Sequence, residues 1–324
     1  MRRLLATPEA GALAGAVLVW IFFAMVAGPA FRSAEGTAAW VNAAAPLGIL
    51  AVAVALLMIG GEFDLSVGSI IGVSGMTVML LTVEAGWSLG PAITAALLLG
   101  AAIGLANGLL VVRTGVPSFL VTLGTLFVLR GLTIAVSRAI TGRTQIGGLA
   151  AVPGYDTWRP LLAADLGPFR IGILWWVVLV LVATWLLRRT PAGNWIYAAG
   201  GGAAAARSAG VPVTRVKVAL FMATATTAAL VGIMQAVRFT GADALRGEGQ
   251  EFRAIIAVVI GGTLLTGGYG SAVGALLGAA IFGMVQQGIV ITGADADWFQ
   301  VFLGAMLIGA VLVNDWTRRQ AVRA

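Results

Sequence analysis

The sequence contains no cysteine and no histidine among its 324 residues. A disulfide framework, thiolate metal sites, a cysteine nucleophile and histidine acid–base chemistry are therefore excluded. The only lysine, Lys217, lies between two valines. A nucleotide-binding P-loop requires Gly-x-x-x-x-Gly-Lys followed by Ser or Thr, so this chain cannot hold one. We expect no catalytic residue, cofactor or metal in this chain.

Charged residues are also scarce. They make up 10% of the chain, whereas 60% is hydrophobic and the mean hydropathy is +0.99. A soluble protein has about 25% charged residues. Apolar runs of about 20 residues, the length that crosses a bilayer, recur throughout. The composition predicts an all-α integral membrane protein, folded as one transmembrane domain over residues 1–324.

The apolar segments predict about ten transmembrane helices, although eight spans remain an alternative. The segments are 11–28, 43–60, 66–83, 91–112, 117–136, 171–187, 216–237, 254–265, 271–291 and 298–313. The first follows Met1-Arg2-Arg3 like a signal peptide, but the later spans favour an uncleaved helix. Segment 254–265 is too short to cross alone, so it is either tilted and extended or re-entrant.

The net charge of +7 reflects arginines that flank apolar runs, which the positive-inside rule explains better than nucleic-acid binding. An even number of spans places both termini in the cytoplasm. The long loops 137–170 and 238–253 then face outside. The basic residues assigned to the inside are Arg2, Arg3, Arg113, Arg188, Arg189, Arg207, Arg215, Lys217, Arg318, Arg319 and Arg323.

A short internal repeat is present. The sequence Leu-Leu-Gly-Ala-Ala-Ile at 98–103 recurs at 276–281, and Thr114-Gly115 recurs at the same offset as Thr292-Gly293. The copies fall in the fourth and ninth spans, and an offset of five spans inverts the second copy in the membrane. This pattern predicts an inverted repeat with broken helices, with chance matching in a Leu/Gly/Ala-rich chain as the alternative.

The segment Gly60–Ser69 places Glu62 and Asp64 between apolar stretches. Its glycine pair permits a helix break, and Asp64 or Ser66 could cap the helix that restarts. Charges at membrane depth usually face a cavity, a partner or a pathway. Glu62, Asp64 and Ser66 are candidates to line the pathway, with capping and an interfacial Glu62 as the alternative.

The segment Gly115–Gly124 begins a helix at Pro117 and continues to Arg130. Phe119 and Thr122 are pathway candidates, with helix packing as the alternative for the hydroxyl groups. Arg130 is a candidate too. It lies inside an apolar run, so it should find a carboxylate, a carbonyl or water.

Acidic residues also precede the eighth span. Glu248 and Glu251 are pathway candidates, with ion pairs to their neighbours Arg246 and Arg253 as the alternative. Glycines at 261–262 and 267–270 permit a further break between helices.

The longest inside loop, 188–215, holds a glycine turn at 200–202, a short alanine-rich helix and a Gly-Val-Pro stop at 210–212. Such a helix could dock into another protein or lie on anionic membrane lipid. These residues alone do not choose between the two.

Four blocks in order resemble the permease subunits of bacterial ribose/xylose-type ABC importers. Gly60–Ser69 resembles Gly-Gly-Ile-Asp-Leu-Ser-Val-Gly-Ser, and Pro117–Gly124 with Arg130-Gly131 resembles Pro-x-Phe-x-x-Thr-Leu-Gly and Arg-Gly. Tyr197–Val211 and Glu248–Ser271 resemble the family's loop and its Glu-Gly-x-Glu and Gly-Gly-Thr block. Two departures stand out: Glu62-Phe63 replaces one Ile beside Asp64, and Gly202 replaces Asn.

The resemblance implies that two permease chains, usually identical, bind two ATP-binding subunits on the cytoplasmic face of the inner membrane. A periplasmic binding protein would deliver a small sugar-like solute for import by alternating access. The loop at 200–210 would be the coupling helix that contacts the ATPase. Its candidate residues are Gly200, Gly201, Ala205, Ala206, Arg207 and Gly210.

Two alternatives remain. A secondary transporter driven by an ion gradient would use Glu62, Asp64 and Arg130 as a relay. A permease of the same wider class would instead carry nucleosides or branched-chain amino acids.

Overall fold

The computed structural model describes residues 8–293, 295, 298–306 and 308–309. The helices are α1 (Pro8–Val26), α2 (Gly28–Arg32), α3 (Ala34–Ile59), α4 (Val67–Met79), α5 (Leu89–Thr114), α6 (Ser118–Thr141), α7 (Tyr155–Leu162), α8 (Gly172–Arg189), α9 (Pro191–Ser208), α10 (Val213–Arg238), α11 (Gln250–Ile260) and α12 (Ala272–Ile291). A π-helical turn (Leu80–Glu84) continues α4, and a 3₁₀ turn (Leu149–Ala151) precedes α7. The strands are β1 (Gln145–Gly147), β2 (Asp165–Leu166), β3 (Phe169–Arg170) and β4 (Gly241–Asp243).

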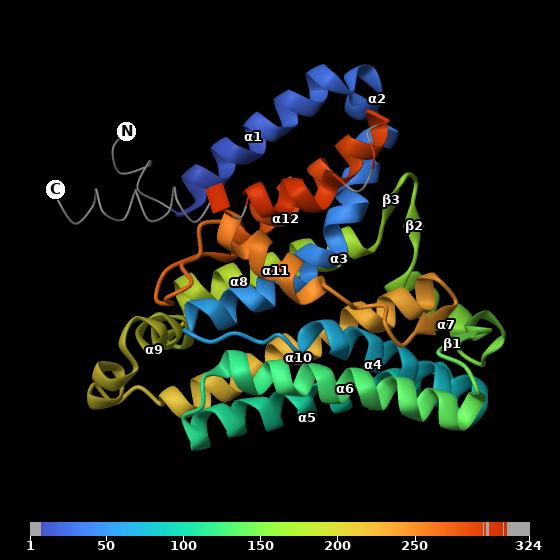
Figure 1. Cartoon of the computed structure of the whole chain (residues 1–324), viewed down its shortest axis with the longest axis horizontal. Coiled ribbons are helices and arrows are strands. Elements are labelled where there is room, and N and C mark those ends of the chain that lie inside the picture. The colour runs from blue at the N-terminus through green and yellow to red at the C-terminus, as the bar shows by residue number, and fades with distance from the viewer. Residues whose placement is uncertain (1–7, 294, 296–297, 307, 310–324) are drawn as a thin grey trace.

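The two ends of the molecule differ in structure (Figure 1). At one end, β1 pairs with β4 in antiparallel register, so the two loops predicted to face the same side meet there. Strands β2 and β3 form a separate hairpin near this end. The opposite end carries α9. We call these the β4 end and the α9 end.

Eight of the described helical segments are long and apolar enough to cross a membrane, and they match eight of the ten predicted spans. The predicted span 254–265 overlaps α11, which has only 11 residues. The predicted span 298–313 is helical over 298–306 and extends beyond the described residues. Five of the arginines used to predict orientation also lie outside them, namely Arg2, Arg3, Arg318, Arg319 and Arg323. The remaining basic residues predicted inside all lie at the α9 end.

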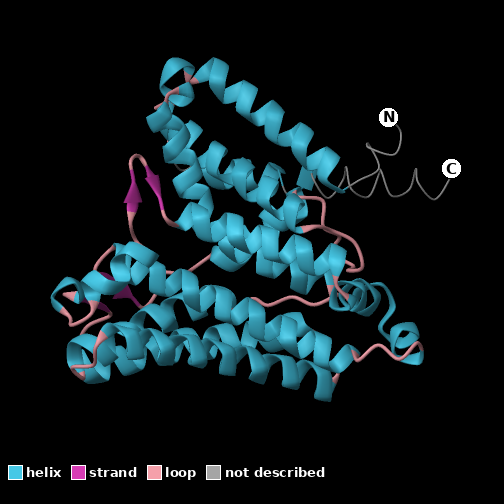
Figure 2. Cartoon of the chain, turned by 180° about the vertical axis from the view of Figure 1, so that it is seen from behind, coloured by secondary structure: helices cyan, strands magenta, loops and turns pink. Residues whose placement is uncertain are grey.

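The third crossing begins with irregular chain before its helix starts. Helix α3 stops at Ile59, and Gly61 adopts a left-handed φ of 83°, a conformation that glycine tolerates without strain. The chain then runs without regular structure until α4 begins at Val67. Figure 2 shows this segment as a loop that passes between helices within the bundle. The glycine pair therefore breaks the helix as predicted.

The eighth crossing is broken in the same way. From β4 the chain descends along α4, where it contacts Gly75 through Ala242, Gly72 through Ala244 and Gly68 through Gly247. Helix α11 then continues, and the following loop reaches the α9 end, where Gly268 donates to the carbonyl of Ile59. The short eighth span therefore crosses as irregular chain followed by a half-length helix.

The two broken crossings lie side by side and run in opposite directions (Figure 1). Helix α5 packs along α10, and α12 packs along α3. Glycines allow the close approach of the backbones in both pairs of helices. A Cβ at Gly104 would overlap the backbone of Phe221, and a Cβ at Gly283 would overlap that of Trp40. Helices α4 and α11 begin side by side and run to opposite ends (Figure 1). The repeated sequence at 98–103 and 276–281 lies on α5, which runs toward the α9 end, and on α12, which runs away from it (Figure 1), so the two copies have the opposite directions that an inverted repeat requires.

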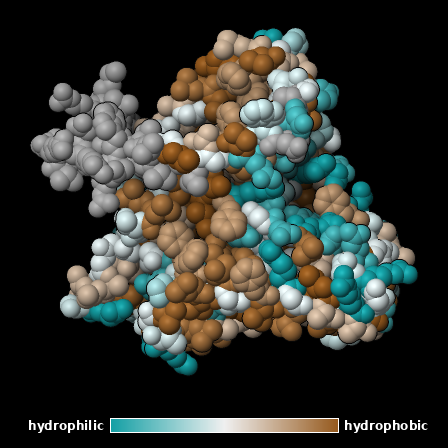
Figure 3. Space-filling model, in the orientation of Figure 1, coloured by the Kyte–Doolittle hydropathy of each residue, from teal (hydrophilic) through white to brown (hydrophobic). Residues whose placement is uncertain are grey.

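The surface agrees with a membrane protein. In Figure 3 the middle of the molecule is largely hydrophobic, and hydrophilic residues gather toward the β4 end and around α9. Exposed apolar side chains cover the outer helices α1, α6 and α8. Helix α3 is instead buried over most of its length. The outer helices therefore present the surface that lipid or another chain would cover.

Candidate solute pathway and coupling interface

The irregular segment before α4 is held by hydroxyl groups of α6. The backbone N–H of Phe63 donates to Ser118 Oγ, and that of Leu65 donates to Thr122 Oγ1, each at 3.0 Å. Thr122 is fully buried. Backbone N–H groups at membrane depth must be satisfied internally, and these hydroxyls satisfy two of them. The sequence left solute contact and helix packing open for the hydroxyl groups of this helix, and the structure shows that Ser118 and Thr122 bind backbone N–H groups.

Asp64 and Ser66 start a buried polar network. Asp64 Oδ1 accepts from the Ser66 backbone N–H at 2.8 Å and from its hydroxyl at 2.5 Å. Ser66 Oγ accepts from Asn107 Nδ2 at 3.0 Å, and Asn107 Oδ1 accepts from Thr125 at 2.7 Å. Asp64 thus holds the turn that leads into α4, although α4 itself has no side-chain cap at Ser66, and Asp64 lines neither of the two cavities described below. The sequence analysis missed Asn107, whose signal is an amide inside an apolar helix.

Arg130 on α6 forms ion pairs with two carboxylates at and just before the start of α11. It lies 3.2 Å from Glu248 Oε1 and 3.7 Å from Glu251 Oε1. Glu251 is 3% exposed and touches Gly68 at the start of α4, whereas Glu248 is 60% exposed. The prediction that Arg130 finds a carboxylate is confirmed.

The alternative that Glu248 and Glu251 pair with their sequence neighbours is wrong. The Arg246 guanidinium lies over the Phe239 ring at 4.7 Å from the ring centroid, and that of Arg253 lies 6.0 Å from the Phe299 centroid. Both glutamates face Arg130 on α6 instead, Glu248 from the loop before α11 and Glu251 from the first turn of α11.

Glu62 forms an ion pair with Lys217 at the α9 end. Both side chains are largely buried, with 11% and 15% exposed. The pair ties the break after α3 to the first turn of α10. Phe119 takes a different position, since its side chain is 49% exposed on α6.

Helix α9 begins earlier than predicted. The predicted glycine turn at 200–202 is helical up to Gly201, and only Gly202 has non-helical dihedrals, φ −178° and ψ 82°. The kink separates a first half from the short alanine-rich half that was predicted. Ala206 packs on Ala199 and Val213, while Ala205, Arg207 and Gly210 are exposed.

The first half of α9 makes a backbone contact with both broken crossings. A Cβ at Gly200 would overlap the Ile59 carbonyl oxygen and lie 2.7 Å from the Gly268 nitrogen. A Cβ at Gly267 would lie 2.7 Å from the Cα of Gly61. We call Gly61, Gly200, Gly267 and Gly268 the glycine joint. A movement of α9 therefore acts directly on the end of α3 and on the loop after α11.

A hydrogen bond supports the glycine joint. The Tyr197 hydroxyl donates to the Gly270 carbonyl at 2.9 Å. Burial, together with the nearby negative charge of Glu9, raises the pKa of Tyr197, so the phenol stays protonated and able to donate.

A polar cavity of about 210 Å³ lies between α3, α10, α11 and α12, in the half of the molecule away from α9. Its polar side chains are Asn42, Arg170, Gln235, Gln250, Arg253 and Gln286. Its apolar wall includes Leu50, Ile71 and Phe282. None of the predicted pathway residues lines it. The signal that could have found it is the placement of amides inside the apolar helices α3, α10 and α12.

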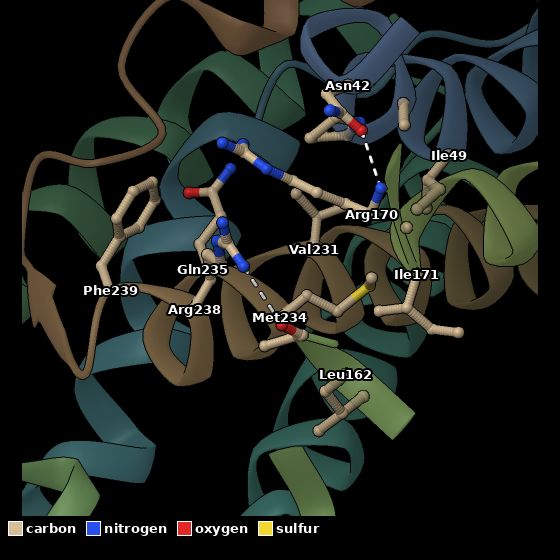
Figure 4. A pocket seen from close by; sticks show the side chains of 14 residues that line it. Asn42, Ile49, Leu162, Arg170, Ile171, Val231, Met234, Gln235, Arg238 and Phe239 are labelled. Atoms are coloured by element: carbon tan, nitrogen blue, oxygen red, sulfur yellow. Dashed lines mark hydrogen bonds between the residues drawn. The ribbon is translucent and has the colours of Figure 1, made fainter. Parts of the chain in front are cut away.

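A second, mainly apolar cavity of about 130 Å³ adjoins the first and shares Asn42, Arg170 and Gln235 with it. Figure 4 looks into this cavity and shows the side chains of Arg170, Gln235 and Arg238 close together. Asn42 Oδ1 accepts from the backbone N–H of Arg170 at 2.9 Å, which fixes the β2–β3 hairpin at the cavity.

Eight candidate spans, two crossings that contain irregular chain, a polar cavity between helices and an exposed helix at one end define a multi-pass membrane permease. The branched-chain amino acid transport system / permease component family matches residues 36–311. The chain belongs to this family, and it is a transport component and not an enzyme.

Curated relatives agree with this class. The chain is 30% identical to the xylose transport system permease protein XylH of Escherichia coli K12, covering 95% of this chain and 92% of the relative. It is 33% identical to the ribose import permease protein RbsC of the same organism, covering 82% and 81%. It is 34% identical to the probable ABC transporter permease protein y4mJ of Sinorhizobium fredii, covering 96% and 91%. The predicted resemblance is confirmed. No solved structure matches the chain.

Proposed function

We propose that this chain is the membrane-spanning subunit of an ATP-binding-cassette importer that moves a small sugar or sugar-like solute into the cytoplasm. It would lie in the bacterial inner membrane with both termini in the cytoplasm. Two ATPase subunits would bind at the α9 end, and a periplasmic solute-binding protein would deliver the solute at the β4 end. A second copy of the chain would complete the pathway.

The glycine joint is the observation that carries this proposal. An exposed helix outside the spans has no role in a pathway by itself, but α9 touches the backbone of both broken crossings. ATP-driven displacement of α9 would move the ends of both repeats together. In this proposal Gly200 and Gly201 act at the joint, while Ala205, Arg207 and Gly210 face the ATPase and Ala206 anchors the short half.

Named relatives and the cavity support a sugar-like solute. The relatives XylH and RbsC are named for xylose and ribose, although the family itself is described by branched-chain amino acids. Amide groups around the cavity can both donate to and accept from hydroxyl groups. A branched aliphatic side chain would need an apolar niche instead.

The pathway residues predicted from the sequence have a supporting role in this proposal. Glu62 and Arg130 are ion-paired, and Asp64 accepts hydrogen bonds from Ser66. A proton relay needs groups that can exchange protons, whereas Glu62 and Arg130 are held in ion pairs. This arrangement favours an ATP-driven importer over a secondary transporter.

Reconstitution tests the proposal. The chain is placed in vesicles with its ATPase and binding protein, and uptake of labelled pentoses and hexoses is measured with and without ATP. Arg207→Glu should abolish uptake and weaken ATPase co-purification. Arg143→Glu, which changes an exposed arginine at the β4 end, is the control for ATPase co-purification and should leave it unchanged. Uptake that ignores ATP and collapses with an ionophore would refute the importer.

A further inference from the structure

The polar cavity has an unbalanced charge. Arg170 and Arg253 line it, and no Asp or Glu is among the described residues that do. The carboxylates nearest in sequence are engaged elsewhere: Glu251 pairs with Arg130, and Asp165 pairs with Arg238 at 2.6 Å. Within the described part of the chain, neither Arg170 nor Arg253 forms an ion pair.

This imbalance has an energetic consequence. Guanidinium groups inside a membrane protein normally find a carboxylate, a carbonyl or water, because an unpaired charge at membrane depth is costly. Of the two, Arg170 is exposed on the β2–β3 hairpin, whereas Arg253 in the first turn of α11 is only partly exposed and lies 6.0 Å from the Phe299 ring centroid, with no carboxylate partner among the described residues. An anionic group of the solute would supply the missing counter-charge and accept charge-assisted hydrogen bonds.

The rest of the lining recognises hydroxyl groups. Gln235, Gln250 and Gln286 come from α10, α11 and α12, and their amides make no hydrogen bond with other described residues. Phe282 offers an apolar surface, with 3% of its side chain exposed. A volume of about 210 Å³ lies below the range of about 300–1,000 Å³ that is usual for drug-sized ligands, so the solute is small.

We propose that this cavity binds a small polyhydroxylated anion, a sugar acid or sugar phosphate, with Arg170 and Arg253 at its charged group and the glutamines at its hydroxyls. The proposal rests on the proposed function and narrows its solute class. A neutral aldose would satisfy the glutamines and leave both guanidinium groups without a counter-charge.

Direct binding tests this without ATP or partners. The purified chain in lipid nanodiscs is equilibrated with labelled D-xylonate, and D-xylose, D-ribose 5-phosphate and acetate compete at matched ionic strength. We expect D-xylonate or the sugar phosphate to compete far better than D-xylose or acetate, and the stronger of the two identifies the charged group. Equal competition by D-xylose would overturn the anionic group, and equal competition by acetate would overturn the polyhydroxylated one.

Charge variants locate the site. Arg253→Gln and Arg170→Gln should each weaken D-xylonate binding about tenfold to hundredfold, the range for hydrogen bonds to charged groups. The control Arg246→Gln, whose guanidinium lies over Phe239 and does not line the polar cavity, should leave binding unchanged. Equal effects of all three variants would overturn the site.

Uptake measurements distinguish a failure of this inference from a failure of the proposed function. ATP-dependent uptake of a neutral aldose that is undiminished in Arg253→Gln would overturn the anionic solute and leave the importer intact. Uptake that does not require ATP would overturn the importer and leave the binding result in place.

Discussion

Gly200→Ala should damage the glycine joint, whereas Gly201→Ala should not. The Cβ added at Gly200 would overlap the Ile59 carbonyl oxygen and lie 2.7 Å from the Gly268 nitrogen. The nearest atom to a Cβ at Gly201 is 3.9 Å away, an ordinary contact. The two variants make the same chemical change one residue apart, so helix propensity cannot explain a difference between them.

The cost of Gly200→Ala follows from two contributions. Overpacking a close contact costs about 1–3 kcal/mol. The backbone must also shift to make room for the methyl group. This shift would break the 2.8 Å hydrogen bond from the Gly268 N–H to the Ile59 carbonyl, and such a bond contributes about 1 kcal/mol net. We expect a loss of about 2–4 kcal/mol when the two are combined.

Two assays read out this prediction. Thermal unfolding of the purified chain in detergent reports the loss of stability, and reconstituted vesicles report uptake per ATP hydrolysed. Gly200→Ala should unfold at a lower temperature and transport less solute per ATP, because α9 no longer fits against both crossings. Indistinguishable Gly200→Ala and Gly201→Ala variants would refute the role of the joint.

Three further predictions concern buried polar contacts. Lys217→Met should destabilise the chain by about 3–5 kcal/mol by leaving Glu62 buried and unpaired, measured by thermal unfolding. Arg130→Met should cost a similar amount, because Glu251 is 3% exposed, and the same assay should show it. Thr122→Val should cost about 1–3 kcal/mol by leaving a backbone N–H without a partner, and should speed hydrogen exchange at the chain entering α4.

Each prediction has its own control. Adding Glu62→Gln to Lys217→Met, or Glu251→Gln to Arg130→Met, should recover part of the lost stability, and no recovery would contradict the ion-pair explanation. Thr94→Val is the control for Thr122→Val, since the exposed Thr94 hydroxyl bonds only to its own helix. Equal losses from the two threonine variants would contradict the backbone-binding role.

The crossings were predictable from the sequence because they depend on local properties. Apolar length located eight spans, and the glycine pair at 60–61 located the first break. The short apolar segment 254–265 also predicted that this part of the chain cannot cross as one full helix, and α11 has only 11 residues. The sequence could not say that irregular chain completes the crossing, because that depends on the contact of Gly68, Gly72 and Gly75 with a distant segment.

The site was harder to predict because its contacts join residues far apart in the chain. Arg130 and Glu248 are separated by 118 positions, so the neighbouring arginines looked like the better partners. The cavity glutamines were not predicted from the sequence, because a single amide in an apolar helix is a weak signal of a binding site. Only the fold brings Gln235, Gln250 and Gln286 together.

The glycine joint constrains the backbone of α9 but not the exposed side chains of that helix. It is made of backbone on both sides, so it depends on the path of α9 and not on the side chains of its outer face. Of residues 203–209, all except the buried Ala206 and the partly buried Ala203 are exposed, and these exposed positions can differ between relatives while the inner contact stays intact. A permease built this way can acquire a new ATPase through the outer face of α9 alone, and a new solute through the cavity, as two independent modules.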